Sequence, residues 1–201
     1  MTAAWLLPVV TVIVCSSSGN IFVVPLQAYS GYHALITSSV SAFMVIMGIT
    51  LAMMILTIYL LRLIVYGLPR HAAIISVFLP LGPTGQSGYS LLLAGHNFRS
   101  LIPINSGSSE FLHSTFVAQT IDAVCTCLAF CLWTLATMWA LYGLLAILAR
   151  TIYFRQRIPF HSNFWGLVFP NVGFLIYSCC VLLTSWTGSV CQPHVAVGIN
   201  F

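Results

Sequence analysis

The stretch SAFMVIMGITLAMMILTIYLLRLIVY, residues 41–66, carries a single charged side chain, Arg62. An α-helix rises about 1.5 Å per residue, so a helix of this length crosses the roughly 30 Å hydrocarbon core of a bilayer. Arg62 lies near the end of the stretch, where its long side chain can reach the membrane interface. The stretch therefore predicts a membrane-spanning helix.

The composition of the whole chain points the same way. Of 201 residues, 60% are hydrophobic and 4% are charged, whereas a soluble domain has roughly a quarter of charged residues. This excludes a water-soluble fold. Nucleic-acid binding needs clustered basic residues, and here the basic residues are six scattered arginines, so we expect no nucleic-acid partner. The fold class is an all-α polytopic membrane protein, with the lipid bilayer as its environment.

Five apolar segments are long enough to span a membrane. They are residues 4–27, 41–66, 71–95, 117–150 and 162–187. We therefore expect a transmembrane domain over residues 1–187, followed by a tail at 188–201. The chain would be a multi-pass membrane protein.

The arginines predict the orientation of the chain. They concentrate around the second and fourth connections, which by the positive-inside rule are cytoplasmic. The chain would then begin on the cytoplasmic side, and each odd and even span would form a hairpin. The arginines concerned are Arg62, Arg70, Arg150, Arg155 and Arg157.

Prolines occur in the odd spans and not in the second and fourth. Pro8 lies in the first span, Pro80 and Pro83 in the third, and Pro170 in the fifth. A proline inside a helix removes a backbone hydrogen bond and kinks the helix. The pattern predicts kinked odd spans around a polar or wet interior, with regular even spans outside them. Alternatively, the prolines reflect only their higher frequency in membrane helices.

Polar residues also interrupt the third span, in SVFLPLGPTGQSGYSLLLAGHNF at 76–98. A helix broken there would expose backbone N–H groups that, with hydroxyl and amide dipoles, can receive an anion. Alternatively, the glycines serve close helix packing, although packing alone does not require Gln86. The first span adds a small polar patch. The pathway candidates are Ser16, Ser17, Ser18, Gly82, Pro83, Thr84, Gly85, Gln86 and Ser87.

Three motifs carry a family resemblance. WLLPVVTVIVCSSSG (5–19), SVFLPLGPTGQSGYSLLLAG (76–95) and FHSNFWGLVFPNVGF (160–174) resemble, in this order, the second half of the tellurite-resistance/dicarboxylate transporter family. That family includes malic acid transporters, slow anion channels and fungal sulfite efflux proteins, and the last are the most similar. The resemblance implies a ring of ten helices, paired as hairpins around a central pore.

The resemblance also implies a function. It assigns the five spans to helices five to nine of the ring, so we expect a partial chain. The expected activity is transport of small anions, most readily sulfite efflux. The alternatives are malate or dicarboxylate transport, or a non-functional truncated fragment. A homotrimer in the plasma membrane is the expected setting.

Relatives close their pore with a phenylalanine of an inner helix. The resemblance favours Phe169, beside Pro170, as this gate, with Phe22 in the first span as a weaker candidate. The alternative for Phe169 is an ordinary lipid or core contact. Asp122, near the start of the fourth span, either takes up a proton that is coupled to anion movement or is simply solvated at the interface.

The sequence offers no set of catalytic residues. The six histidines fall in loops or at span ends, and the serines at 16–18 have no histidine in their own span. The cysteine spacing does not match a zinc site. We therefore expect no enzymatic activity, no metal and no cofactor.

Overall fold

The computed structural model describes residues 3–67, 76–102, 114–153 and 165–187. Besides a 3-10 turn at residues 76–78, these residues form five α-helices and two further short helical turns. The elements are η1 (Ala3–Leu6), α1 (Leu7–Gln27), α2 (Gly31–Tyr66), α3 (Leu81–Leu101), α5 (Thr115–Leu148), η3 (Ala149–Tyr153, a π-helical turn) and α6 (Trp165–Thr187).

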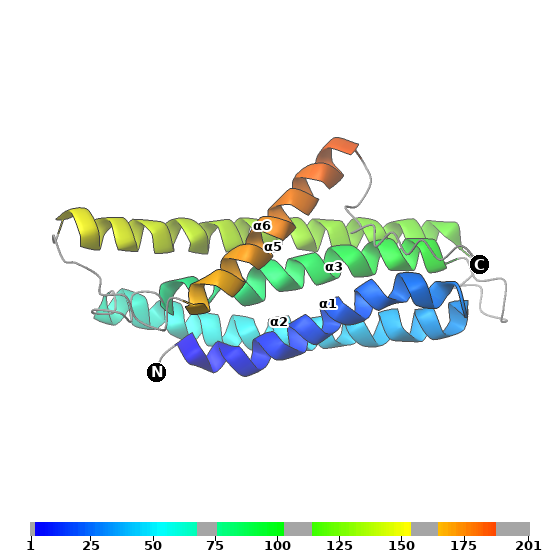
Figure 1. Ribbon diagram of the computed structural model, residues 1–201, viewed down its shortest axis with the longest axis horizontal. Helices are drawn as coiled ribbons and strands as arrows, with labels where there is room; N and C mark the ends of the chain where they lie inside the picture. Colours follow the sequence, from blue (N-terminus) through cyan, green and yellow to red (C-terminus); the bar gives the residue numbers. More distant parts are fainter. Residues whose placement is uncertain (1–2, 68–75, 103–113, 154–164, 188–201) are drawn as a thin grey trace.

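The helices form an elongated bundle in which successive elements alternate in direction (Figure 1). α1 and α2 make a tight antiparallel hairpin, α3 and α5 run antiparallel to each other, and α6 crosses the bundle obliquely. The start of α1 and the ends of α2 and α5 lie at the same end of the bundle. Arg62, on the last turns of α2, and Arg150, directly after α5, therefore share that end.

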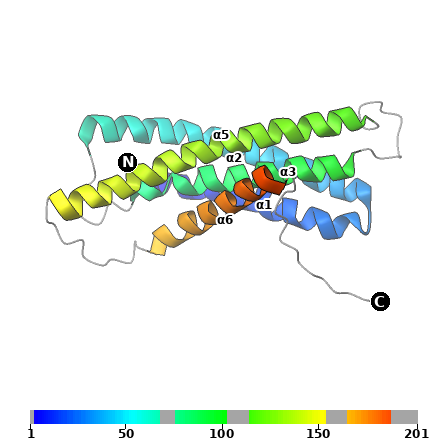
Figure 2. The same cartoon turned by 90° about the horizontal axis from the view of Figure 1, so that it is seen from above.

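α3 is the central helix. It packs against α1, α2, α5 and α6, and Figure 2, seen from above, shows it between its neighbours. Most of its residues are buried, including the polar Thr84, Ser87, Ser90 and Asn97. α3 is therefore enclosed by the other helices of the described part, whereas the predicted polar or wet interior lined by the odd spans stays a prediction.

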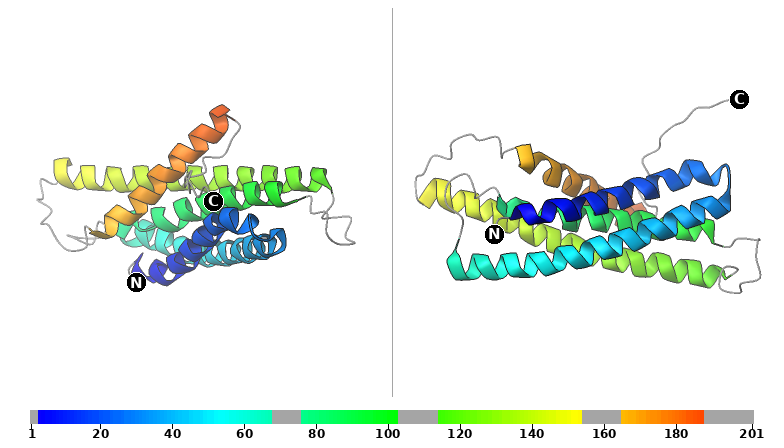
Figure 3. Two further views of the ribbon diagram at one scale, coloured as in Figure 1. Left: turned by 45° about the vertical axis from the view of Figure 1, so that its right-hand side comes forward. Right: turned by 90° about the horizontal axis from the view of Figure 1, so that it is seen from below.

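α2 and α5 each bury one narrow stripe. In α2 the buried positions recur every three or four residues and include Ser38, Ser41, Gly48 and Ala52, which is the spacing of one helix face. The remaining faces of α2 and α5 expose large apolar side chains. Small residues in the stripe let neighbouring helices approach closely, and the exposed apolar faces fit lipid contact. Figure 3 shows both long helices along the outside of the bundle.

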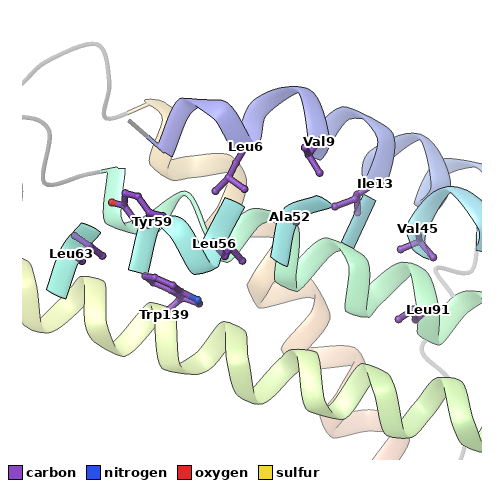
Figure 4. Close-up of a cluster of buried hydrophobic side chains, with 10 residues drawn as sticks. All are labelled: Leu6, Val9, Ile13, Val45, Ala52, Leu56, Tyr59, Leu63, Leu91 and Trp139. Carbon is purple, nitrogen blue, oxygen red and sulfur yellow. The ribbon is translucent and has the colours of Figure 1, made fainter. Parts of the chain in front are cut away.

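A hydrophobic cluster joins four helices at the end of the bundle where α1 begins (Figure 4). It contains Leu6 near Leu56 of α2 and Ile13 near Ala52, and Trp139 of α5 stacks at a tilt on Tyr59, with ring centroids 6.1 Å apart. A second cluster, around the fully buried Tyr177, joins α6 to α3 and α5. The core therefore follows both sides of α3.

Three helices of the described part are long and apolar enough to cross a membrane: α1, α2 and α5. α2 begins at Gly31, ten residues before the predicted start at 41. α3 carries too many polar residues to qualify, and the apolar part of α6 within the described residues is short, Asn171–Leu182. The predicted spans at 71–95 and 162–187, and the ring of hairpins, stay predictions.

Three prolines lie at the starts of helices, whereas Pro25 lies inside α1. Pro8 is the second residue of α1, directly after η1, and a proline in a first turn lacks no helical hydrogen bond. At this position Pro8 removes no hydrogen bond of α1, and its kink stays a prediction. Pro80 precedes the first residue of α3, and Pro83 lies in its first turn. From Leu81 to Leu101 the helix is continuous, so Gly85, Gln86 and Ser87 lie in regular helix. The break at Pro80 stays a prediction.

α2 and α5 contain no proline and run without interruption, as predicted. Pro170 lies inside α6, but its side chain falls outside the described residues, so its kink stays a prediction. The tail at 188–201 and the arginines at 70, 155 and 157 also lie outside the described residues.

Candidate functional site

Neutral polar side chains line the interface between α1 and α3. On α3 they are spaced four and seven residues apart, which places them on one helix face. None is ionisable, and all but one are buried. We call these residues the polar seam: Ser16, Ser17 and Asn20 of α1, with Gln86, Ser90 and Asn97 of α3.

The hydrogen bonds at the centre of the seam have a fixed direction. The Ser16 hydroxyl donates its only hydrogen to the Ser41 carbonyl of α2, at 2.6 Å. Ser16 Oγ also lies 2.7 Å from Ser90 Oγ, so Ser90 must be the donor in that pair. Ser90 Oγ in turn accepts from the Asn20 amide at 3.2 Å. The chain of donors therefore runs from Asn20 through Ser90 and Ser16 to α2.

The seam continues toward the far end of α3. The Asn97 amide donates to the Asn20 backbone carbonyl at 2.8 Å, and Asn20 Nδ2 also donates to the Ser90 carbonyl at 3.2 Å. Because a carbonyl can only accept, this contact fixes which end of the Asn20 amide faces α3. Asn20 Oδ1 is buried and has no hydrogen-bond partner within the described part of the chain.

Gln86 is the one half-buried member of the seam. Its Nε2 donates to Ser17 Oγ at 2.7 Å. Its Oε1 faces α6, where it lies 3.2 Å from the position that a Cβ on Gly173 would occupy. Gln86 therefore lies between α1 and α6. It contacts Ser17, which is also one of the pathway candidates.

Other predicted pathway residues serve α3 itself. The Thr84 hydroxyl donates to the Pro80 carbonyl at 2.9 Å, and the Ser87 hydroxyl donates to the Pro83 carbonyl. The Gly82 N–H donates to the Leu79 carbonyl at 3.2 Å.

These contacts change the prediction for the start of α3. The Thr84 N–H donates to the Pro80 carbonyl, and Pro83 has no N–H. The first turn of α3 thus offers fewer free backbone donors to an anion than a broken helix was expected to provide. Ser18 is exposed and does not join the seam.

Glycines bring α6 close to α3. The α carbon of Phe174 lies 3.5 Å from the position of a Cβ on Gly85, and Tyr177 fills the space beside Gly88. Small residues allow such approach of helix backbones. The packing interpretation of Gly85 and Gly88 therefore agrees with the structure, whereas Gln86 remains unexplained by packing.

The two gate candidates are placed differently. The side chain of Phe22 is exposed on α1. Phe169 belongs to α6, but its side chain lies outside the described residues. Phe22 is therefore not part of the polar seam, and the gate role of Phe169 stays a prediction.

Asp122 pairs with an arginine at the end of the bundle opposite Arg62. Its Oδ2 lies 3.0 Å from Arg99 Nη1, and its side chain is 16% exposed. Gly95 gives it room, since a Cβ there would lie 3.2 Å from Asp122 Oδ1. The ion pair was not foreseen from the sequence, because the partners are on different helices.

Three central residues of the seam were also missed from sequence: Asn20, Ser90 and Asn97. A signal existed, since Gln86, Ser90 and Asn97 share one face of α3 and Asn20 lies one turn after Ser16 and Ser17. Nowhere in the described ranges do three histidine, cysteine or acidic side chains gather as a metal site would need.

The family model for voltage-dependent anion channels matches residues 1–191. The sulfite efflux pumps of Arthroderma benhamiae and Trichophyton rubrum are each 33% identical over 170 residues, which cover 85% of this chain and 42% of each relative. The sulfite efflux pump of Candida albicans is 37% identical over 103 residues, covering 51% of this chain and 21% of that protein.

The chain thus spans less than half the length of these curated relatives. No solved structure matches it significantly. The names of the family and of the relatives indicate transport rather than catalysis, and the apolar helices α1, α2 and α5 fit a multi-pass membrane protein. The match over residues 1–191 shows that the chain belongs to the voltage-dependent anion channel family.

Proposed function

We propose that this protein moves small anions across a membrane and that its physiological activity is sulfite efflux. The observation that carries the proposal is the polar seam, a row of buried hydroxyl and amide groups without a fixed charge in an otherwise apolar bundle. The family and the names of the fungal relatives support the same function.

Neutral donors suit rapid transport of an anion. A buried ion pair with a lysine or arginine would hold the anion strongly, whereas conduction requires binding that is weak enough for release. Within the described residues of α1 and α3, the only ionisable basic group besides His96 is Arg99, at the end of α3. Along α1 and α3 the anion would therefore meet neutral dipoles, because the charge of Arg99 at the end of α3 is paired with Asp122.

Sulfite is proposed over malate because the similar proteins named above are sulfite efflux pumps. The test is efflux from vesicles that contain the purified protein and are loaded with sulfite or malate. Sulfite flux well above that of protein-free vesicles is the expected result. Malate flux alone would replace sulfite with a dicarboxylate, and flux of neither anion would refute the transport proposal.

The proposal includes a gate, a location and an assembly. Phe169 would close the pathway from α6, so Phe169→Ala should increase sulfite flux at rest. We place the protein in the plasma membrane as a homotrimer. Microscopy of the tagged protein tests the location, and the mass of the detergent-solubilised protein, measured by light scattering, tests the trimer.

A further inference from the structure

An anion is bound by hydrogen donors, and most donors of the polar seam are already used. A hydroxyl has a single hydrogen. Ser16 gives its hydrogen to the Ser41 carbonyl and Ser17 gives its own to the Val14 carbonyl, at 2.9 Å. Ser90 donates its hydrogen to Ser16 Oγ, which has no hydrogen left to give. These three hydroxyls therefore keep no hydrogen for a ligand.

The amides of Asn20 and Asn97 are also poor candidates. Asn20 Nδ2 lies within hydrogen-bond distance of both the carbonyl and the hydroxyl of Ser90. Asn97 is 1% exposed, and its Nδ2 donates to the Asn20 carbonyl. An anion could not reach either amide without separating α1 from α3.

Gln86 differs from all of these residues. Its Nε2 has two hydrogens, and the contact with Ser17 uses one. Across the described ranges, no acceptor is found for the second hydrogen. Gln86 is also half-buried rather than enclosed. It thus combines a free donor with access from outside the bundle.

Two neighbours fix the orientation of this amide. Ser17 has given its hydrogen to Val14, so its oxygen can only accept, and the NH2 end of Gln86 must face it. On the other side, the absence of a side chain at Gly173 leaves room for Gln86 Oε1. The side chain is therefore held between α1 and α6 with a defined direction for its free N–H.

We propose that the free N–H of Gln86 contacts the transported anion and determines specificity, and that Ser17 and Gly173 act as positioning residues. This inference rests on the proposed transport function. The ligand class is a small oxyanion that accepts one charge-assisted N–H···O hydrogen bond. One neutral donor binds such an anion weakly, which permits its release to the other side.

The first test replaces the amide in the complete protein. Gln86→Met keeps the length of the side chain and removes both N–H groups. This variant should raise the sulfite concentration for half-maximal flux by about tenfold, which corresponds to the lower end of the free-energy cost of losing a hydrogen bond to a charged group. Gln119→Met is the matched control, because Gln119 is exposed on α5. Equal half-saturation in Gln86→Met, Gln119→Met and the unchanged protein would overturn the inference.

The second test separates positioning from direct contact. Ser17→Ala removes the acceptor that orients the amide, and Gly173→Ala crowds Oε1. Each should raise the half-saturating concentration, but neither should add to the effect of Gln86→Met in a double variant, because both act through Gln86. Additive effects would contradict the positioning roles. Ser17→Ala keeps this test valid if Gly173→Ala does not fold.

The third test does not depend on flux. NMR spectra are recorded of the protein with 15N-labelled glutamine side chains while sulfite replaces gluconate at constant ionic strength. The Gln86 signal is the one that disappears from the spectrum of Gln86→Met. A shift of the Gln86 signal, with the Gln119 signal unchanged, is expected. If vesicles show no transport but this signal shifts, the proposed function fails and the anion site stands. If transport occurs and the signal does not shift, the site is refuted and the function stands.

Discussion

Tyr177 of α6 lies directly against Gly88 of α3, in the space that a side chain at residue 88 would fill. Its ring is fully buried, and its hydroxyl donates to the Ala129 carbonyl of α5. One tyrosine therefore joins three helices, and the position of α6 depends on a glycine in the central helix.

This relationship predicts the effect of Gly88→Ala. The added methyl group overlaps the Tyr177 ring, so α6 or the ring must move. Overpacking of this kind costs about 1–3 kcal/mol. We expect a lower midpoint of thermal unfolding in detergent micelles, followed by tryptophan fluorescence.

Gly31→Ala is the control for this prediction. Gly31 begins α2, and a Cβ there meets nothing within 4 Å. Alanine favours the helix over glycine by up to about 1 kcal/mol, so the midpoint should stay the same or rise slightly. An equal fall in the midpoint of thermal unfolding in Gly88→Ala and Gly31→Ala would show that Tyr177 does not pack on Gly88 as described.

The directional hydrogen bonds of the polar seam predict the effect of Ser90→Ala. The variant removes the donor to Ser16 and one acceptor of Asn20. We expect a loss of stability of about 1 kcal/mol, within the range measured for hydrogen bonds between membrane helices. Thr134→Ala is the control, because its exposed hydroxyl bonds only to its own helix, at the Cys131 carbonyl. If Ser90→Ala and Thr134→Ala have the same free energy of unfolding, the seam does not stabilise the protein.

The start or end of a helix could be predicted from the sequence only where it coincides with the start or end of an apolar run. α2 begins ten residues before the predicted start because residues 31–40 contain a histidine, serines and a threonine. Thr37 and Ser39 satisfy their hydroxyls on the carbonyls of His33 and Leu35 within the same helix. Hydropathy counts those hydroxyls as polar, although the helix itself satisfies them.

Part of the candidate site could be predicted from the sequence, and the rest depends on how the helices pack. Gln86 and Ser17 were both candidates, and the structure brings them together. The sequence could not show that Thr84 and Ser87 donate to their own helix, while Ser90 donates to α1. That difference depends on which face of α3 meets α1, and it becomes visible only once the helices are packed.

The ion pair of Arg99 and Asp122 predicts a small, salt-dependent effect. Asp122→Asn keeps the shape of the side chain and removes its charge. Because the Arg99 side chain is 55% exposed, the pair should contribute about 0.2–1 kcal/mol. The difference in unfolding midpoint from the unchanged protein should shrink as salt rises from about 0.01 M to about 1 M. A loss that is independent of salt would indicate that packing beside Gly95, rather than charge, is responsible.

The arginine distribution predicts which end of the bundle faces the cytoplasm, and two tyrosines allow a matched test. Tyr66 ends α2 beside Arg62, and Tyr29 lies between α1 and α2 at the opposite end; both are highly exposed. With the native cysteines replaced, Tyr29→Cys should react with a membrane-impermeant maleimide on intact cells. Tyr66→Cys should react only after the cells are permeabilised, because the positive-inside rule places the Arg62 end in the cytoplasm. The reverse pattern would invert the orientation, and Arg99 would then lie at the cytoplasmic end of the proposed pathway.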